Sequence, residues 1–194
     1  MGWRGSASAG SPRSTSSAIR SCRRSSGPMS GMRSGPPPER PGKRRGISLQ
    51  QRLRPAPFRG RILRRLVRNA LDLLDAAGAD LRILVVGDAE MARANLRFLG
   101  HEGTTTVLTF PEEAPGQAEA GRITGDILVS ADACLSRTEG WPESPEERVF
   151  FFIVHGILHL LGQDHLAGRG EAVRMRRMEL RVYRKVLAKE PGRG

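Results

Sequence analysis

Three of the four histidines in this chain, His155, His159 and His165, lie within eleven residues, and imidazole nitrogens commonly bind transition metals. In a helix, residues four apart lie on the same face, so His155 and His159 can present two ring nitrogens to one point. Gly162 predicts the end of that helix, and the turn through Asp164 can bring His165 back toward the same point. Structural zinc sites usually have four protein ligands, whereas three imidazoles are typical of a catalytic site. We therefore expect one zinc ion per chain, with its fourth position left for water.

The same run argues against a zinc peptidase. Its spacing matches the His-Glu-x-x-His-x-x-Gly-x-x-His signature of the metzincin peptidases, but Gly156 stands where those enzymes have glutamate. That glutamate is the general base of peptide hydrolysis, and glycine cannot replace it. A bare His-x-x-x-His pair occurs on many helices that bind nothing, so the metal prediction depends on His165 and Gly162 as well.

The first two histidines fall in a segment that is strongly patterned as a helix. Ser144, Pro145 and Glu147 predict its start, because serine caps helices, proline suits the first helical position and an acid three residues after the cap completes a capping box. The residues that follow are apolar nearly all round, which predicts a helix at the centre of a domain, packed on a sheet. Two histidines in such a helix would be costly unless a partner satisfies them.

The rest of the chain after residue 46 alternates between strand and helix patterns. Apolar runs bounded by glycine or proline predict strands, and apolar residues three and four apart predict amphipathic helices. We predict strands at 47–52, 81–86, 105–110 and 123–130, and helices at 61–77, 88–99 and 171–187, the second capped by Asp88, with a short helix starting at Asp132.

These residues resemble the YbeY-type endoribonucleases, the rRNA maturation factors of bacteria and organelles. The segment His155–His165 is similar to the family's His-Gly-x-Leu-His-Leu-x-Gly-x-Asp-His, and Gly100–Pro111 resembles its Gly-x-Asp-x-Pro-Thr-Asp-Val-Leu-Ser-Phe-Pro. Gly125–Ser130 is similar to its Gly-Asp-Ile-x-Ile-Ser strand. The likeness covers about residues 47–188, in the same order and spacing.

The resemblance implies a single α+β domain, with a small mixed β-sheet packed with helices and a central buried helix that carries the metal motif. It also implies a zinc-dependent endoribonuclease that cuts single-stranded RNA, matures the 3′ end of small-subunit (16S) rRNA and takes part in ribosome quality control. His155, His159 and His165 would be the zinc ligands. Zinc lowers the pKa of its bound water to about 7 and polarises phosphate, so we expect zinc-bound water to attack without a separate carboxylate base.

One departure from the family pattern concerns the residue before Gly100. Many members have an arginine there that is credited with a catalytic or RNA-binding role, whereas this chain has Leu99. A guanidinium suits the charge that develops on a phosphorane, and leucine cannot supply it. His101 or Arg97 are the candidates to act instead. The resemblance thus leaves an alternative open: a ribosome assembly factor that binds RNA or a ribosomal protein and keeps a mainly structural zinc.

Two aspartates are candidates to orient a ligand histidine through a hydrogen bond, namely Asp164 and Asp126. Either residue can equally serve a turn or a cap. The partners that the resemblance implies are single-stranded or precursor rRNA, the small ribosomal subunit, a small-subunit protein and an Era-like GTPase.

Residues 1–46 differ from the rest in composition and charge. Ten basic residues and one acid, Glu39, give this segment nine of the twelve net positive charges of the chain, so the remainder is only mildly basic. The segment is rich in Arg, Ser, Gly and Pro and lacks apolar periodicity, which predicts a disordered leader. Met29 or Met32 as the true start, a dispensable bacterial extension, or a transit peptide would each account for it.

We therefore expect a leader at 1–46, a metal-dependent ribonuclease domain at 47–188 and a short flexible tail at 189–194. The longest apolar run, Val149–Val154, is far shorter than the roughly 20 residues that span a bilayer. The first thirty residues contain no apolar segment typical of a secretory signal. We expect a bacterial cytoplasmic protein that does not bind membranes, with organelle targeting by the leader as the alternative.

Overall fold

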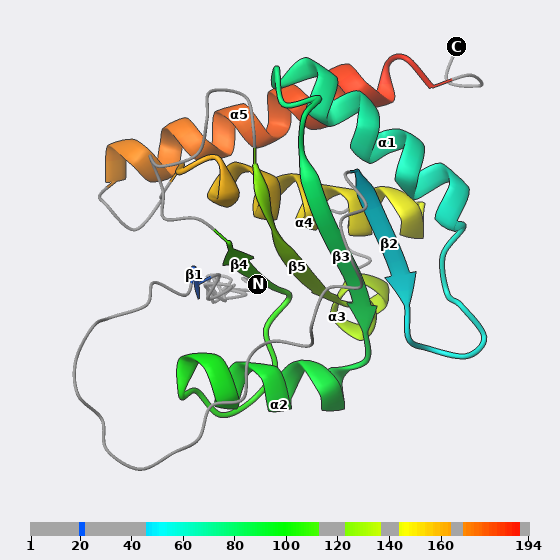
Figure 1. The fold of residues 1–194 in the computed structure, drawn as a ribbon, viewed down its shortest axis with the longest axis vertical. Helices are drawn as coiled ribbons and strands as arrows, with labels where there is room; N and C mark the ends of the chain where they lie inside the picture. The colour runs from blue at the N-terminus through cyan, green and yellow to red at the C-terminus, as the bar shows by residue number, and fades with distance from the viewer. Residues whose placement is uncertain (1–19, 22–45, 113–122, 137–143, 164–168, 191–194) are drawn as a thin grey trace, which may run out of the picture.

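The computed structural model describes residues 20–21, 46–112, 123–136, 144–163 and 169–190 of the 194-residue chain. Within these ranges the chain forms one five-stranded sheet of order β1-β4-β5-β3-β2 together with five helices (Figure 1). Of the predicted leader, only Arg20, Ser21 and Gly46 are described, the first two as the two-residue strand β1 beside β4. The other leader residues and 191–194 lie outside the described residues, so the disordered leader and flexible tail stay predictions.

The sheet is mixed, as expected. Strands β2 (Ile47–Gln51), β3 (Asp80–Val86) and β5 (Thr124–Ser130) lie side by side and run parallel. Strand β4 (Val107–Pro111) runs antiparallel to β5 and parallel to β1 (Arg20–Ser21). The two central strands contain several Val and Ile residues, Ile83, Val85 and Val86 in β3 and Ile127 and Val129 in β5, whose branched side chains favour the extended backbone.

The helices cover the two faces of the sheet unequally. Three of them contact one another on one side of the sheet, α1 (Gly60–Leu73), α4 (Pro145–Leu160) and α5 (Arg169–Leu187), whereas α2 (Asp88–Leu99) lies apart from them (Figure 1). The short helix α3 (Ala131–Ser136) follows β5 directly and contacts both α2 and α4. No helix in the described part of the chain is long and apolar enough to cross a membrane.

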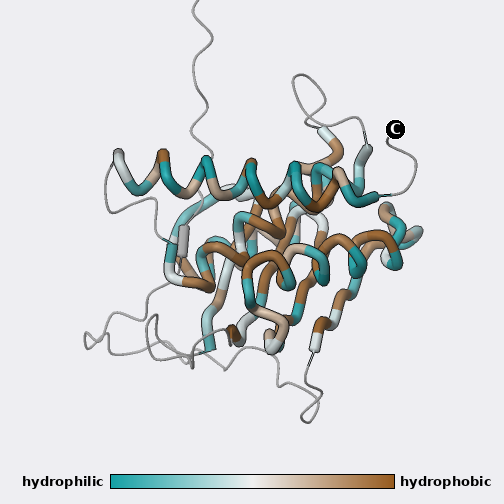
Figure 2. The backbone as a smooth tube through the Cα atoms, turned by 90° about the horizontal axis from the view of Figure 1, so that it is seen from above, coloured by the Kyte–Doolittle hydropathy of each residue, from teal (hydrophilic) through white to brown (hydrophobic). Residues whose placement is uncertain are grey.

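Alternate side chains of the central strands enter two separate apolar clusters. Ile83 and Ile127 belong to the large cluster shared with α1, α4 and α5, whereas Leu84 belongs to a smaller cluster with Met91 and Ala94 of α2. This is the period of two that a pleated strand requires when both of its faces are covered. Hydrophobic positions, drawn in brown, accordingly gather on the elements at the centre of the molecule (Figure 2).

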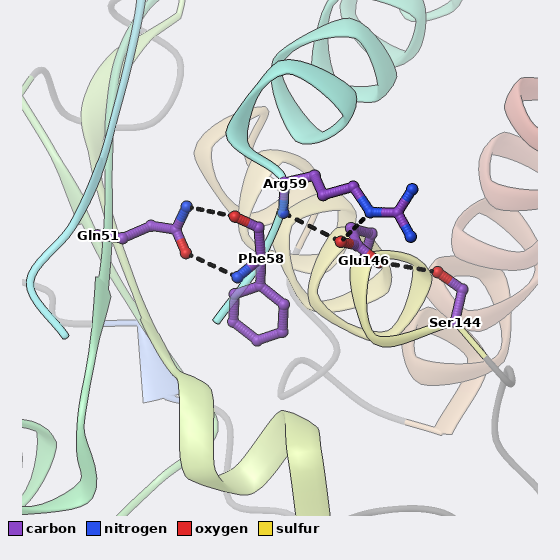
Figure 3. Close-up of polar contacts among 5 residues, drawn as sticks. All are labelled: Gln51, Phe58, Arg59, Ser144 and Glu146. Carbon is purple, nitrogen blue, oxygen red and sulfur yellow. Dashed lines mark hydrogen bonds and ion pairs between the residues drawn. The ribbon is translucent and has the colours of Figure 1, made fainter. Parts of the chain in front are cut away.

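Helix α4 is the central buried helix that the sequence predicts, and every residue from Glu146 to His159 is buried. Ser144 is its N-cap and Pro145 its first residue, which confirms the predicted start. The serine hydroxyl, however, donates to the Glu146 carboxylate at 3.1 Å instead of capping a backbone N–H. The other carboxylate oxygen of Glu146 accepts from the backbone N–H of Arg59 at 3.0 Å, which ties the start of α4 to the start of α1 (Figure 3).

Gln51 fixes the chain that leads from β2 into α1. Its amide nitrogen donates to the Phe58 carbonyl at 2.8 Å, and its amide oxygen accepts from the Phe58 N–H at 3.1 Å (Figure 3). Both backbone groups of Phe58 are thereby satisfied away from regular secondary structure, as a buried residue requires.

Two helix ends differ from the predictions. The helix predicted at 61–77 ends at Leu73, because Asp75 adopts a left-handed conformation with φ of 54° and Ala76 donates back to the Leu71 carbonyl at 2.9 Å. Asp88 is the first residue of α2 and not its cap, since Gly87 occupies that position.

The side chain that accepts the first N–H of α2 comes from another element. The carboxylate of Asp132 in α3 accepts from the Asp88 N–H at 2.7 Å, while the Asp88 carboxylate accepts from the Ser130 hydroxyl at 2.7 Å. A carboxylate from α3 therefore satisfies a free N–H group at the start of α2.

Candidate metal centre

His155 and His159 lie one turn apart on α4 and point at each other. Their Nε2 atoms are 2.9 Å apart and their ring centroids 4.6 Å apart. Both residues are buried, with 6% and 7% of their surface exposed. The helical spacing therefore brings two ring nitrogens to one point, as predicted for this pair.

The third predicted ligand, His165, lies outside the described residues, as does Asp164. No set of three or more His, Cys, Asp or Glu side chains that could hold an ion occurs among the residues that the structure describes. The complete three-histidine set therefore remains a prediction.

The end of α4 at Gly162 and Gln163 is described and matches the predicted helix end. Gly162 has a φ of 81°, its N–H donates to the His159 carbonyl at 2.9 Å, and the Gln163 N–H donates to the Leu158 carbonyl at 3.0 Å. This pair of bonds is the Schellman arrangement that ends many helices. Glycine suits the position because a left-handed backbone is strained for residues with a Cβ.

An acid on α5, Glu179, contacts His155 from the side opposite His159. Its Oε1 bonds His155 Nδ1, and its Oε2 accepts from Arg176 Nη1 at 3.2 Å. The Arg176 guanidinium in turn lies 4.9 Å from the ring centroid of Phe151 in α4. Glu179 is only 3% exposed.

The surroundings of Glu179 favour its charged form. Burial by itself raises the pKa of this carboxyl, but the hydrogen bond and charge of His155, together with Arg176, outweigh it, and the net pKa lies below the usual range. A carboxylate that stays ionised in a buried position can accept the N–H of a neighbouring imidazole.

The sequence prediction missed Glu179, although a signal for it exists. Buried residues of α5 recur at intervals of four, three and four, at Met175, Glu179, Val182 and Val186. An acid in the apolar stripe of an amphipathic helix is costly unless it is paired, which marks it as a candidate for a specific contact.

Gly156 packs directly on the sheet. A Cβ built on it would lie 3.0 Å from methyl carbons of both Ile127 and Thr109, on β5 and β4. The glutamate that metzincin peptidases have at this position therefore has no room here, which agrees with the argument against a peptidase.

The other candidate residues lie elsewhere in the fold. Asp126 on β5 accepts from Arg82 Nε at 3.1 Å across the neighbouring strand. Its side chain belongs to the strand face opposite that of Ile127, which packs toward α4, so it is not placed to orient His155 or His159. Asp126 therefore does not orient His155 or His159, and Glu179 occupies that place for His155. An interaction of Asp126 with His165, which lies outside the described residues, stays a prediction.

Arg97 and His101 are exposed at the end of α2. The Arg97 guanidinium lies 5.4 Å from the ring centroid of Phe98, and Leu99 packs against the small apolar cluster between α2 and the sheet. A part for Arg97 or His101 in catalysis stays a prediction.

The described residues fit a zinc ion in three respects. Two imidazole nitrogens converge, borderline-soft zinc favours such nitrogen ligands, and a carboxylate holds the second nitrogen of one ring. A metal-binding histidine almost always donates its other ring N–H to a carboxylate, a carbonyl or water. His155 has this arrangement with Glu179.

The family model and the curated relatives that match this chain carry the same name. The family model of "Endoribonuclease YbeY" matches residues 55–187. A protein of that name from Roseiflexus castenholzii is 34% identical over 123 residues, which cover 61% of this chain and 77% of the relative. Another, from Geobacter sulfurreducens, is 29% identical over 142 residues, which cover 71% of this chain and 93% of the relative.

A solved structure shares the fold. The solution structure of TM1509 from Thermotoga maritima matches with a TM-score of 0.53 at 18% identity, over 77% of this chain and 100% of that chain. At this identity the likeness concerns the fold alone, and it agrees with the single α+β domain. Since the family match spans nearly all of the described domain, the chain belongs to the endoribonuclease YbeY family.

Proposed function

We propose that this protein is a zinc-dependent endoribonuclease, specific for single strands, that matures the 3′ end of 16S rRNA and acts in ribosome quality control. The observation that carries the proposal is the pair of converging Nε2 atoms of His155 and His159, 2.9 Å apart on a buried helix of a YbeY-family chain. The name of the family supplies the class of reaction. The rRNA target and the zinc ion are part of the proposal.

In this proposal His155, His159 and His165 hold one zinc ion per chain. When bound, zinc would supply a Lewis acid that activates water at neutral pH and polarises a phosphate oxygen. The chain itself contributes rigidity: α4 is buried from Glu146 to His159, and Gly162 ends it in a left-handed turn three residues before His165 in the sequence. Ligands held in place by packing do not have to reorganise when the ion binds.

Substrate contacts would come from exposed side chains at the end of α2. Arg97 and His101 lie at the end of α2 and are the proposed helpers at the phosphate, since a guanidinium forms strong charge-assisted bonds with phosphate oxygens. The proposed partners are precursor rRNA, the small ribosomal subunit, a small-subunit protein and an Era-like GTPase, and the proposed compartment is the bacterial cytoplasm.

The experiment compares the purified full chain with His159→Ala on a single-stranded RNA and on the matching duplex, with and without chelator. We expect cutting of the single strand only, lost with chelator and lost in the variant, and one zinc per chain by metal mass spectrometry. The variant, purified in the same way, controls for contaminating ribonuclease. Equal cutting by the variant, or cutting that chelator does not inhibit, would refute the proposal.

One observation favours the second candidate, an assembly factor with a mainly structural zinc. Leu99 packs against the apolar cluster of α2 at the place where the family resemblance puts an arginine. No guanidinium is supplied from that position. A protein that carries one zinc, binds single-stranded RNA and cuts none of the RNAs tested would support this candidate over the nuclease.

A further inference from the structure

We propose that Glu179 is a positioning residue of the metal centre: its carboxylate fixes the His155 ring so that Nε2 faces the ion. The inference rests on the proposed metal site and assigns a role on α5 to a residue 24 positions from His155 in the chain. Glu179 would not itself touch the ion.

The two nitrogens of His155 face different partners. Nε2 faces His159 and Nδ1 bonds the Glu179 carboxylate. A neutral imidazole carries one N–H and one lone pair, and an ionised carboxylate only accepts hydrogen bonds. Contact with Glu179 therefore selects the form of His155 with the proton on Nδ1 and the lone pair on Nε2, which is the form that can bind a metal there.

Glu179 is itself held by a second contact between the helices. Arg176 donates to its other oxygen at 3.2 Å and lies 4.9 Å from the ring centroid of Phe151. Phe151 and His155 are one turn apart on α4, and Arg176 and Glu179 are nearly one turn apart on α5. The four side chains thus form one unit across the helix pair, which restrains the carboxylate in both position and direction.

The test uses the full chain and the variant Glu179→Gln, with Glu171→Gln on the same helix as the matched control, because Glu171 is partly exposed and pairs only loosely with Arg174 at 3.7 Å. A Gln amide can accept from Nδ1–H or donate to Nδ1, so it selects neither form of the ring. Zinc affinity is measured by competition with a chelator. We expect Glu179→Gln to bind zinc about 10–100-fold more weakly and the control to bind as the wild type does.

A second measurement needs no metal. The ¹⁵N chemical shifts of the His155 ring, assigned with a His155→Gln sample, should show a protonated Nδ1 in the wild type and a mixture of both forms in Glu179→Gln. If Glu179→Gln does not fold, Arg176→Gln replaces it, with a smaller loss of affinity expected.

The outcomes separate this inference from the proposed function. Zinc bound equally tightly by wild type and by the variant, one per chain, would overturn the role of Glu179 and leave the proposed nuclease intact. A variant with a lower melting temperature but unchanged zinc affinity would show a purely structural ion pair and overturn it as well. A wild-type chain that binds no zinc would overturn both proposals.

Discussion

The Glu146 carboxylate accepts the backbone N–H of Arg59 at 3.0 Å, across 87 positions of the chain. This bond joins the first turns of α4 and α1, so it helps to hold the helix that carries His155 and His159 in its place on the sheet (Figure 3).

Replacing Glu146 with alanine should lower the free energy of unfolding by about 1–3 kcal/mol, because the Arg59 N–H loses its charged acceptor. Urea unfolding measures the change. Glu171→Ala is the control, since an exposed pair contributes about 0–1 kcal/mol at most. Equal effects of the two changes would mean that the contact with Arg59 adds nothing specific.

The same carboxyl should make stability depend on pH. Burial raises the pKa of Glu146, but hydrogen bonds from the Arg59 and Glu146 backbone and from Ser144, with the Arg59 charge, lower it below the ordinary value of 4.5. A carboxyl whose pKa is lowered in the folded state stabilises the fold at pH values above its ordinary pKa. This contribution is lost as the pH falls through the folded-state pKa. The gap in unfolding free energy between wild type and Glu146→Gln should be constant near neutral pH and shrink below about pH 4.5. A gap that stays constant down to pH 3 would contradict this.

Gly156→Ala should destabilise the protein, by about 1–3 kcal/mol, because the new methyl meets Ile127 and Thr109 at 3.0 Å. Gly170 in α5 has nothing within 4 Å of a built Cβ, so Gly170→Ala should be neutral or stabilising by up to about 1 kcal/mol. Thermal unfolding compares the two. Adding Thr109→Ser removes one of the crowded methyls and should recover part of the loss.

Gly162→Ala should cost about 1–2 kcal/mol, since an L-residue is strained at a φ of 81°. Gly162→Asn should cost less, because asparagine adopts the left-handed conformation more readily. If zinc affinity is measured together with stability, both should follow the order Gly, Asn, Ala. A similar loss for both variants would point to packing at Gly162 and not to its backbone angle.

Leu99→Arg tests whether the missing arginine limits catalysis. A guanidinium that reaches the phosphate should raise the rate of RNA cutting, by up to about 100-fold. Leu96→Arg is the matched control, on the same helix and already 55% exposed. If both variants raise the rate equally, added positive charge and not the position is responsible, and if neither does, Leu99 is not what limits the activity.

The amino-acid sequence alone was sufficient to predict those features that depend on residues close together in the chain. The spacing of His155 and His159 predicts their convergence because helix geometry places residues four apart on one face. Gly162 predicts the helix end because few other residues tolerate its backbone angle. Apolar patterning likewise predicted strand β5 within one residue and the burial of α4, which extends from Glu146 to His159.

Contacts between distant segments were decided only by the tertiary structure. Glu179 reaches His155 because α5 packs on α4, and Asp132 caps α2 because α3 lies beside it. Asp126 was a reasonable partner for a histidine by its type, but the alternation along β5 turns it toward Arg82. Local sequence determines the backbone angles of a segment and which side chains share one of its faces. Which residue of another segment a side chain contacts depends on how the helices and strands pack, and no single segment encodes that packing.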